Sequence, residues 1–446
     1  MEVKEIIDIV VFEQKGFSFK GEKTYEYHDV LKTHFTEETS FCMRNKDKHC
    51  YAITCDTIKS NNTEEQRYNL ETNYFVGVDW IKNSEKTIYV EPKQNKDDAI
   101  EINYLAMLFE AMQEPQNFKH LDGLCEIYFD KPQIAITQQQ DILTPFLIVQ
   151  YLQILKRIVR KGLKKTYYSV VENLESKVKG EIIVSQTIKS NVFKNRLTKN
   201  VCKYDEFGLN GEENKILKKA LIFSQRVISS YKFQNEQGNI NNLLNYINPA
   251  FENVSDDILV EKIKHFKPNP MYKEYEQALK FALLILKRFS YNITETENND
   301  ETKLTPPYWI DMAKLFELYV FKKLRDVFSS ENEVIHHKKA YYQEIDFLIN
   351  TNDIQMVIDT KYKPRYENQS ISKDDMRQVC GYARLEDIYN TLNKGYSETI
   401  DCLIIYSHQN CPYNFTKEDL KKQKERGYVN FYKLGISLPT ISQNHK

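Results

Sequence analysis

The sequence predicts a multi-domain α+β protein with a β-rich N-terminal region, a helical and mixed middle region, and a C-terminal domain of order α-β-β-β-α-β. Short β-type runs alternate with polar loops over residues 1–93. The middle of the chain instead carries apolar stripes at helical spacing. Near residue 350, two short apolar runs flank a polar turn, which is the pattern of a β-hairpin. The 446 residues suffice for two or three domains.

The N-terminal region is taken as residues 1–135. Its clearest element is a hairpin, in which Tyr74–Ile81 and Thr87–Val90 flank a polar turn. An apolar stripe from about Asp98 to Met112 then predicts a helix.

The middle region, residues 136–291, is predominantly helical. Helices are predicted near Pro145–Arg160 and Glu212–Tyr231, and from about Met271 to Phe289. A short strand is predicted at Glu181–Val184. Residues 292–304 are polar, acidic and poor in apolar side chains, so we expect a linker there.

The C-terminal domain, residues 305–446, begins with an apolar stripe that follows Pro306-Pro307 and predicts a helix with Glu317 at the edge of the stripe. A second helix is expected after residue 372, with Ser372 or Asp374 as its N-cap. The strands are predicted around Glu333–Lys338, on either side of the 350–353 turn, at Asp401–Tyr406, and at Val429–Leu434.

Three side chains of the predicted hairpin indicate a catalytic site. Asp359 and Lys361 are two residues apart, so strand alternation places them on one face, and the turn can fold Asp346 back beside them. Carboxylate oxygens are the ligands that Mg²⁺ prefers, and a nearby amine can stabilise charge on a phosphate. The sequence therefore predicts a metal-dependent site for phosphodiester hydrolysis. A bare Asp-x-Lys is also typical of a solvated strand end, and that alternative stays open on the tripeptide alone.

With this element order, residues 306–446 resemble the PD-(D/E)XK nuclease superfamily. The resemblance implies that Asp346 and Asp359 hold the metal and that Lys361 is the catalytic lysine. It further implies that Glu317 is an additional helical acid at the metal and that Gln378 supports the nucleophile or the phosphate. Ile345 stands where the signature has proline. For Glu317 and Gln378 the alternatives are a helix-face ion pair and a solvated amide.

A second resemblance, to the McrC family, covers about residues 95 to 410. It rests on several blocks that occur in the family's order: Arg160–Tyr167, Glu172–Leu174, Val178–Ile182, Val201–Phe207, Asn214–Leu221, Leu315–Glu317 and Asp359–Lys363. McrC is the nuclease subunit of McrBC-type restriction systems. The resemblance implies Mg²⁺, with Mn²⁺ as a substitute, double-stranded DNA as substrate, and cleavage by two complexes brought together.

The same resemblance implies a partner, the McrB AAA+ GTPase ring, which the N-terminal region would engage and stimulate. By this analogy residues 1–135 are the partner-binding region; the alternative is a scaffold that orients the nuclease. No Walker-type Gly-x4-Gly-Lys-[Ser/Thr] occurs, so we expect no nucleotide bound by this chain itself.

Composition bears on the nucleic-acid affinity, the thiol state and the cellular location of the protein. The formal net charge is −1, with 62 basic and 63 acidic residues, so no global positive field favours nucleic acid. The eight cysteines have no Cys-x-x-Cys spacing and are expected to be reduced thiols. Charges interrupt the apolar N-terminus, and no apolar run approaches membrane-spanning length, so we expect a cytoplasmic protein without membrane contact.

Two other functions remain open. The first is a stand-alone repair or recombination nuclease of the same superfamily, which would cut DNA without a GTPase. The second is a non-catalytic bridging subunit that activates an AAA+ NTPase. The sequence determines neither the recognition sequence nor a requirement for methylated cytosine.

Overall fold

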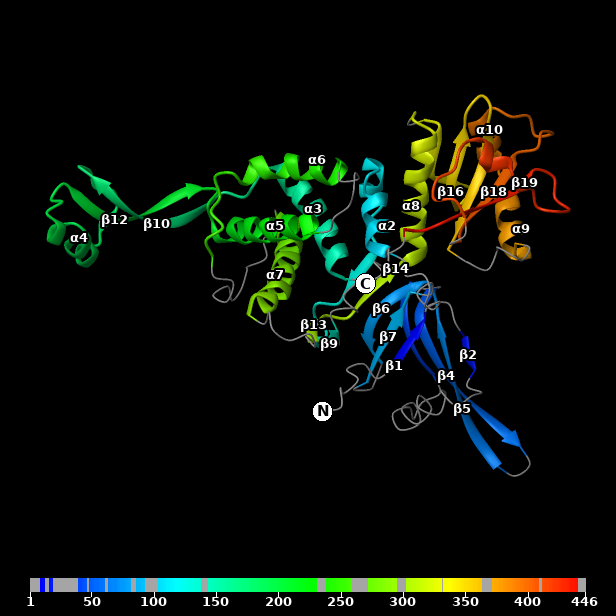
Figure 1. The fold of residues 1–446 in the computed structure, drawn as a ribbon, viewed down its shortest axis with the longest axis horizontal. Coiled ribbons are helices and arrows are strands. Elements are labelled where there is room, and N and C mark those ends of the chain that lie inside the picture. The colour runs from blue at the N-terminus through cyan, green and yellow to red at the C-terminus, as the bar shows by residue number, and fades with distance from the viewer. Residues whose placement is uncertain are drawn as a thin grey trace, which may run out of the picture. The chain divides into compact units, whose positions relative to one another are not determined.

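The computed structural model (Figure 1) describes residues 9–12, 16–18, 39–45, 48–60, 63–81, 86–92, 103–137, 143–230, 238–258, 272–294, 302–330, 332–362, 371–408 and 411–439. The chain divides into two compact units. The first joins Met1–Leu143, Asn235–Asn239 and Asp300–Lys446, and the second joins Thr144–Gln234 and Ile240–Asn299. The N-terminal and C-terminal segments thus share one unit.

A five-stranded sheet of order β1-β7-β6-β14-β8 forms the N-terminal part of the first unit. Its strands are β1 (Ile9–Phe12), β6 (Phe75–Trp80), β7 (Thr87–Glu91), β8 (Cys125–Ile127) and β14 (Tyr308–Asp311). The β6–β7 hairpin is the one that the sequence predicts.

Strand β14 was not predicted. The residues after Pro306-Pro307 form a strand that pairs with β6 and β8 before the predicted helix begins. Trp309 lies opposite Gly77, whose φ is +152°. A Cβ at Gly77 would lie 2.0 Å from the Tyr308 carbonyl oxygen, so only glycine permits this close pairing.

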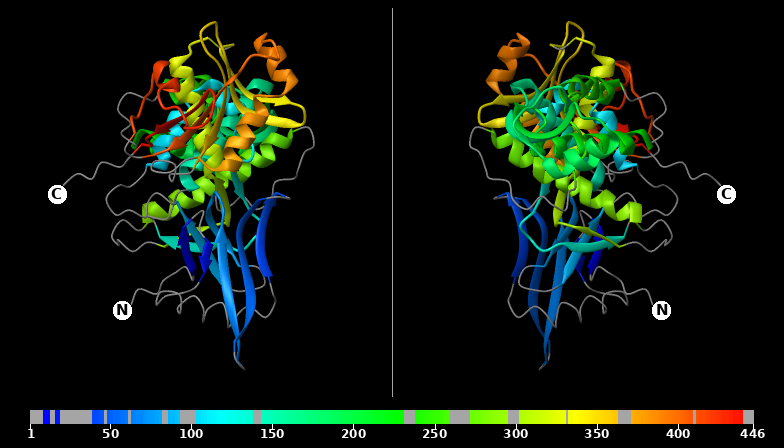
Figure 2. Two further views of the ribbon diagram at one scale, coloured as in Figure 1. Left: turned by 90° about the vertical axis from the view of Figure 1, so that its right-hand side faces the viewer. Right: turned by 90° about the vertical axis from the view of Figure 1, so that its left-hand side faces the viewer.

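Two smaller sheets belong to the same unit. One has the order β2-β5-β4-β3 and consists of β2 (Gly16–Ser18), β3 (Thr39–Asn45), β4 (Lys48–Ser60) and β5 (Thr63–Thr72). Strands β4 and β5 form the long blue ribbon of Figure 2. The other pairs β9 (Ile134–Thr137) with β13 (Thr302–Thr305).

Helix α2 (Tyr104–Ala111) corresponds to the helix predicted from about Asp98, and residues 98–102 lie outside the described residues. The 3-10 turn η2 (Pro115–Lys119) follows it and places His120 at its C-cap.

The C-terminal part of the unit is a five-stranded sheet of order β15-β16-β17-β18-β19. Its strands are β15 (Val334–Ala340), β16 (Gln343–Asn350), β17 (Gln355–Lys361), β18 (Asp401–Ser407) and β19 (Phe431–Ile436). The first three strands are antiparallel neighbours, whereas β17, β18 and β19 run parallel. With helices α8 (Met312–Val327) and α9 (Lys373–Tyr382), the order is the predicted α-β-β-β-α-β.

Helices cover this sheet on both sides (Figure 1). Helix α8 packs Phe321 on Phe347 of β16, with ring centroids 5.6 Å apart. On the other side, α9 and α10 (Glu386–Leu392) bury apolar residues such as Val379 and Ile388 against Val357 and Ile404. Ser372 is the N-cap of α9, one of the two predicted candidates. Strand β18, which lies between β17 and β19, is buried at all seven positions.

The second unit is built mainly of helices: α3 (Leu143–Lys161), α5 (Glu212–Ser230), α6 (Gly238–Ile247) and α7 (Lys273–Thr294). A three-stranded sheet, with α4 (Val184–Ser190) and η4 (Val192–Lys194), interrupts them: β10 (Thr166–Glu175), β11 (Glu181–Ile182) and β12 (Lys199–Gly208). The strand predicted at Glu181–Val184 is shorter than expected, because α4 begins at Val184.

The linker expected at 292–304 has ordered ends, since α7 extends to Thr294 and β13 begins at Thr302; residues 295–301 lie outside the described residues. Among the helices of the described chain, none has both the length and the apolar character that crossing a bilayer requires.

Candidate active site

The site begins where two paired strands separate. The β16–β17 ladder ends at the pair Phe347–Ile358, while β17 continues to pair with β18 as far as Lys361. In the gap, the side chain of Asp346 replaces the ladder. Its Oδ2 accepts hydrogen bonds from the backbone N–H and the hydroxyl of Thr360, both at 2.7 Å. Asp346 is thereby held beside the strand that carries Asp359.

Asp359 and Lys361 lie on the face of β17 that is turned toward α9. Lys361 Nζ is 2.8 Å from Asp359 Oδ2, and it donates a hydrogen bond to Gln378 Oε1 at 2.9 Å. Gln378 in turn donates to the Tyr382 hydroxyl at 2.7 Å, and Asp375 Oδ1 is 3.9 Å from the lysine. One turn of α9 thus fixes the position of the ammonium group.

Glu317 reaches the site from α8, but its carboxylate is turned toward two histidines of β15. Its Oε1 is 2.8 Å from His336 Nε2 and 2.7 Å from His337 Nε2. His337 Nδ1 also contacts Glu344.

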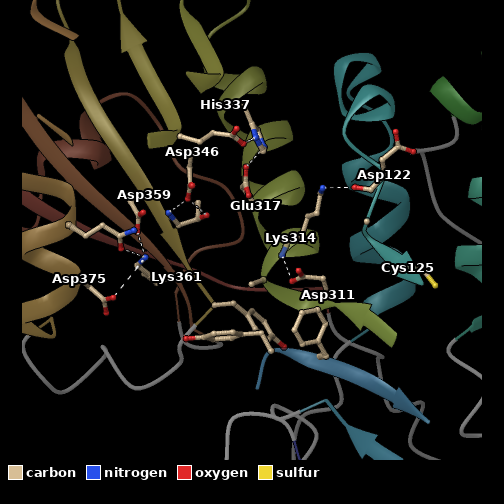
Figure 3. A pocket seen from close by; sticks show the side chains of 18 of the residues that line it. Asp122, Cys125, Asp311, Lys314, Glu317, His337, Asp346, Asp359, Lys361 and Asp375 are labelled. Atoms are coloured by element: carbon tan, nitrogen blue, oxygen red, sulfur yellow. Dashed lines mark hydrogen bonds and ion pairs between the residues drawn. The ribbon is translucent and has the colours of Figure 1, made fainter. Parts of the chain in front are cut away.

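All of these groups except His336 line one polar pocket of about 880 Å³ (Figure 3). Asp346, Asp359, Lys361 and Glu317 point into it, and Gln378 lies at its wall. Eight carboxylate residues line the pocket, against two lysines and one histidine. The acidic residues are Asp122, Glu126, Asp311, Glu317, Glu344, Asp346, Asp359 and Asp375. Such a pocket attracts cations and, by itself, repels phosphate.

Burial and mutual repulsion shift the pKa values of the two central acids. Burial, with repulsion from Asp359 and Glu317, raises the pKa of Asp346 well above its ordinary value. Burial also raises the pKa of Asp359, although the ammonium group of Lys361 opposes the shift. For Lys361, burial acts to lower the pKa, but the Asp359 carboxylate outweighs it and the net pKa is raised.

The pKa values of Glu317 and His337 are shifted in the directions that favour their charged forms. Burial acts to raise the pKa of Glu317, but hydrogen bonds from His336 and His337 outweigh it and lower that pKa to about 2. Burial acts to lower the pKa of His337, but Glu317 and Glu344 raise it to about 9. Glu317 is therefore a carboxylate at neutral pH, paired with an imidazolium.

Asp346 and Asp359 fit a hard divalent cation. Both offer carboxylate oxygens, both disfavour their charged form at this position, and Asp359 Oδ2 is buried without a hydrogen bond of good geometry within the described chain. Glu317 fits less directly, because its carboxylate is engaged by the histidines. Within the described residues, three candidate ligands gather within 4.8 Å only at His120, His336 and His337.

The structure thus brings Asp346, Asp359, Lys361 and Gln378 together. It places Glu317 in the lining of the same pocket, with its carboxylate turned toward His336 and His337. Several lining residues escaped the sequence reasoning. Asp375 had a signal in the sequence, because it lies three residues after Ser372, which is the spacing of a helix capping box. In the structure the Ser372 hydroxyl donates to Asp375 Oδ2 and accepts from the Asp375 backbone N–H at the start of α9. Tyr74, Phe75 and the segment 122–126 had none, because they lie about 200 residues or more from Asp346 in the sequence.

Most of the chain is similar to a known protein family. Residues 70–392 match the family model described as McrBC 5-methylcytosine restriction system component. No curated protein matches. Among solved structures, the chain is similar to one in an assembly of Thermococcus gammatolerans McrB AAA+ hexamers with bound McrC. The identity is 16%, the coverage 98% of this chain and 96% of that one, and the TM-score 0.36.

A second structure, the Thermococcus gammatolerans McrBC complex, shows 17% identity over 71% of this chain and 86% of that one, with a TM-score of 0.27. Both structural likenesses are weak, whereas the family match is extensive. It spans both compact units and includes Asp346, Asp359, Lys361 and Gln378. The chain belongs to the family of McrBC 5-methylcytosine restriction system components.

Proposed function

We propose that this chain is the McrC-like nuclease subunit of a two-component, GTPase-driven restriction system, and that it cleaves double-stranded DNA with a PD-(D/E)XK core. The observation that carries the proposal is the convergence of Asp346, Asp359 and Lys361 on one acidic pocket at the point where β16 and β17 separate. Family membership supports the assignment to a restriction system.

Asp346 and Asp359 would hold Mg²⁺, or Mn²⁺ as its substitute, and Glu317 would be an outer ligand. When bound, the ion supplies Lewis acidity toward a phosphoryl oxygen and lowers the pKa of water. Asp346 is oriented for this role by Thr360, and Asp359 by the ammonium of Lys361. Lys361, fixed by Gln378, presents positive charge where the phosphate would gain negative charge.

The partner would be a McrB-like AAA+ GTPase ring, whose hydrolysis this chain would stimulate. The Thermococcus gammatolerans assembly named above contains McrB hexamers with bound McrC, and we extend that pairing to this chain because of its family. Residues 1–135 remain the proposed partner-binding region. A further partner surface is favoured by the large exposed apolar side chains of residues 166–208, which include Tyr167, Phe193, Leu197 and Phe207.

Double-strand cleavage needs two active sites, so two complexes would have to meet on one DNA. The near-zero net charge fits a subunit that takes part of its DNA affinity from its partner.

The test separates chemistry from partner activation. Asp359→Ala removes a carboxylate from the metal position, so DNA cleavage should fall by at least about a hundredfold. GTPase stimulation of the partner should stay close to that of the unmodified chain. Cleavage is measured on plasmid with the purified pair and Mg²⁺, and GTP hydrolysis in the same samples.

Asp353→Ala is the matched control, because Asp353 is an exposed acid in the β16–β17 turn, outside the pocket lining. It should leave both activities unchanged. Equal loss of cleavage and GTPase stimulation in Asp359→Ala would show that the residue is structural. Cleavage by the chain alone, without a GTPase, would favour the stand-alone nuclease. Intact stimulation without any metal-dependent nicking by the unmodified pair would favour the bridging activator.

A further inference from the structure

Three histidines gather at the pocket, and one of them, His337, is part of its lining. One ring nitrogen from each of His120, His336 and His337 lies within 4.8 Å of the others. Their rings are packed directly together, with centroid separations of 4.0 to 4.8 Å. His120 comes from the end of η2, whereas the other two belong to β15. The cluster therefore joins two segments that lie more than 200 residues apart in the sequence.

The backbone is strained to make this cluster. Adjacent residues of a strand normally point to opposite faces, so His336 and His337 should diverge. His337 instead has a φ of +54°, in the left-handed region that a residue with a Cβ enters at a cost. The result is that both imidazoles reach the same carboxylate oxygen of Glu317. Strain held at one residue of an otherwise regular strand is commonly a mark of function.

The surroundings also suit a cation. Glu317 Oε1 lies 2.8 Å from His336 Nε2 and 2.7 Å from His337 Nε2, so one carboxylate oxygen faces both rings. The side chain of His336 is 3% exposed, and His337 Nε2, the nitrogen that faces Glu317, is buried without a hydrogen bond of good geometry within the described chain. Glu344 contacts the other nitrogen of His337 and would orient that ring.

We propose that His120, His336 and His337, with Glu317 as fourth ligand, form a second metal site that takes a transition-metal ion, with Zn²⁺ as the preferred occupant. Three imidazoles and one carboxylate make a tetrahedral ligand set that suits zinc, whereas Mg²⁺ prefers oxygen ligands alone. Because metal-bound imidazoles are neutral, Zn²⁺ binding would release the proton of the His337 imidazolium to solvent. In a tetrahedral shell with ligands at about 2.1 Å, ligand atoms lie about 3.4 Å apart, so small rotations of the rings would close the present spacing. This site goes beyond the proposed nuclease chemistry, whose metal is held by Asp346 and Asp359; Glu317, the outer ligand of that metal, would lie between the two sites.

The proposal is tested on the full chain without DNA. The protein is stripped with EDTA, exposed to Zn²⁺ and dialysed, and its zinc content is measured by mass spectrometry. We expect one retained zinc per chain. Titration with Co²⁺ should give the visible absorption of tetrahedral, nitrogen-ligated cobalt, and Zn²⁺ should abolish it. Mg²⁺ at the same concentration should not.

Variants locate the site. His120→Asn and His336→Asn should each weaken Zn²⁺ binding by more than tenfold, and circular dichroism checks that they fold. His120 is the safer of the two, since it is only half-buried. His408→Asn is the matched control, because His408 lies outside the cluster and its Nδ1 contacts Cys411 Sγ at 3.4 Å. It should leave zinc content unchanged.

Asp346→Asn separates this proposal from the proposed function, because it should retain zinc while losing cleavage. The absence of retained zinc and of a cobalt spectrum would overturn the metal site, whatever the cleavage activity. Unchanged zinc binding in both His120→Asn and His336→Asn would overturn it equally.

Discussion

The ionised form of Asp346 is destabilised by its surroundings, and a bound cation would relieve this destabilisation. One of its oxygens accepts two hydrogen bonds from Thr360, yet the pKa of the carboxyl is raised by burial and by its acidic neighbours. Two hydrogen bonds are therefore too few to offset desolvation and repulsion. The charged form is disfavoured until a positive charge arrives.

Replacement of this acid by its neutral isostere should stabilise the metal-free protein. Asp346→Asn keeps an oxygen that can accept from Thr360 but removes the repulsion with Asp359, so the free energy of unfolding at neutral pH should rise by roughly 1 kcal/mol. Mg²⁺ should raise the melting temperature of the unmodified chain and leave that of the variant unchanged. Thermal melts with EDTA or with Mg²⁺ measure both effects. A variant that melts lower than the unmodified chain in EDTA would contradict this account.

The difference in the free energy of unfolding between Asp346→Asn and the unmodified chain should grow as the pH rises. The pKa of Asp346 is raised in the folded state, so the unfolded chain releases its proton first as the pH rises. Folding stability therefore falls between the unfolded and the folded pKa, and is fully retained below both. The advantage of Asp346→Asn should be small near pH 4 and should reach its full size above the folded pKa.

At the scale of elements, the β15–β16 hairpin carries an unfavourable turn. Ala340 pairs with Gln343, so Tyr341 and Tyr342 form a two-residue loop, and their φ angles are +39° and +59°. Positive φ at both positions is typical of a type I′ turn, which favours Asn-Gly and disfavours bulky side chains. Both tyrosines are also exposed, at 72% and 102%.

The double change Tyr341→Asn and Tyr342→Gly should therefore stabilise the hairpin by about 1–2 kcal/mol, since the strained residues are replaced by ones that adopt this turn readily. Urea denaturation measures the change. The pair Tyr341→Phe and Tyr342→Phe is the control, because it retains the strain and removes only two hydroxyls, and its stability should not change. Destabilisation by Asn-Gly would show that the exposed tyrosines make contacts that hold the hairpin.

Across the whole first unit, buried polar contacts connect the N-terminal and C-terminal segments. Lys323 of α8 pairs with Glu110 of α2, and their side chains are 3% and 5% exposed. Lys323 also donates to Asn414 at 2.8 Å and lies over the ring of Tyr413. A lysine in the middle of an apolar helix face is thus paired with residues from other parts of the chain, and burial nevertheless lowers the pKa of its ammonium group.

Lys323→Met should destabilise this unit by about 3–5 kcal/mol, because it leaves the Glu110 carboxylate buried without its charge partner, with a hydrogen bond from the Tyr413 hydroxyl. The double variant Lys323→Met with Glu110→Leu should recover most of that loss, since no unpaired charge remains. Urea denaturation of the two single variants and the double variant measures the coupling. Additive losses would show that the two residues contribute independently.

The sequence by itself determined the elements whose signal is local. Helix α8, the strands of the β15–β19 sheet and the placement of Asp359 beside Lys361 follow from periodicities of two or about 3.6 residues, which depend only on near neighbours. The same local reasoning placed Gln378 one turn before Tyr382. It mistook the residues after Pro307 for the approach to a helix, because β14 acquires its strand partners from β6 and β8.

Only the tertiary structure decided how the pocket is enclosed. The packing of the N-terminal segment brings Phe75 and Asp122 into the lining of the pocket, and it brings His120 to the histidines of β15. Glu317 is turned toward those histidines for the same reason. Contacts between residues 200 positions apart leave no periodic trace in the sequence, because they depend on how whole elements pack and not on the order of neighbouring residues.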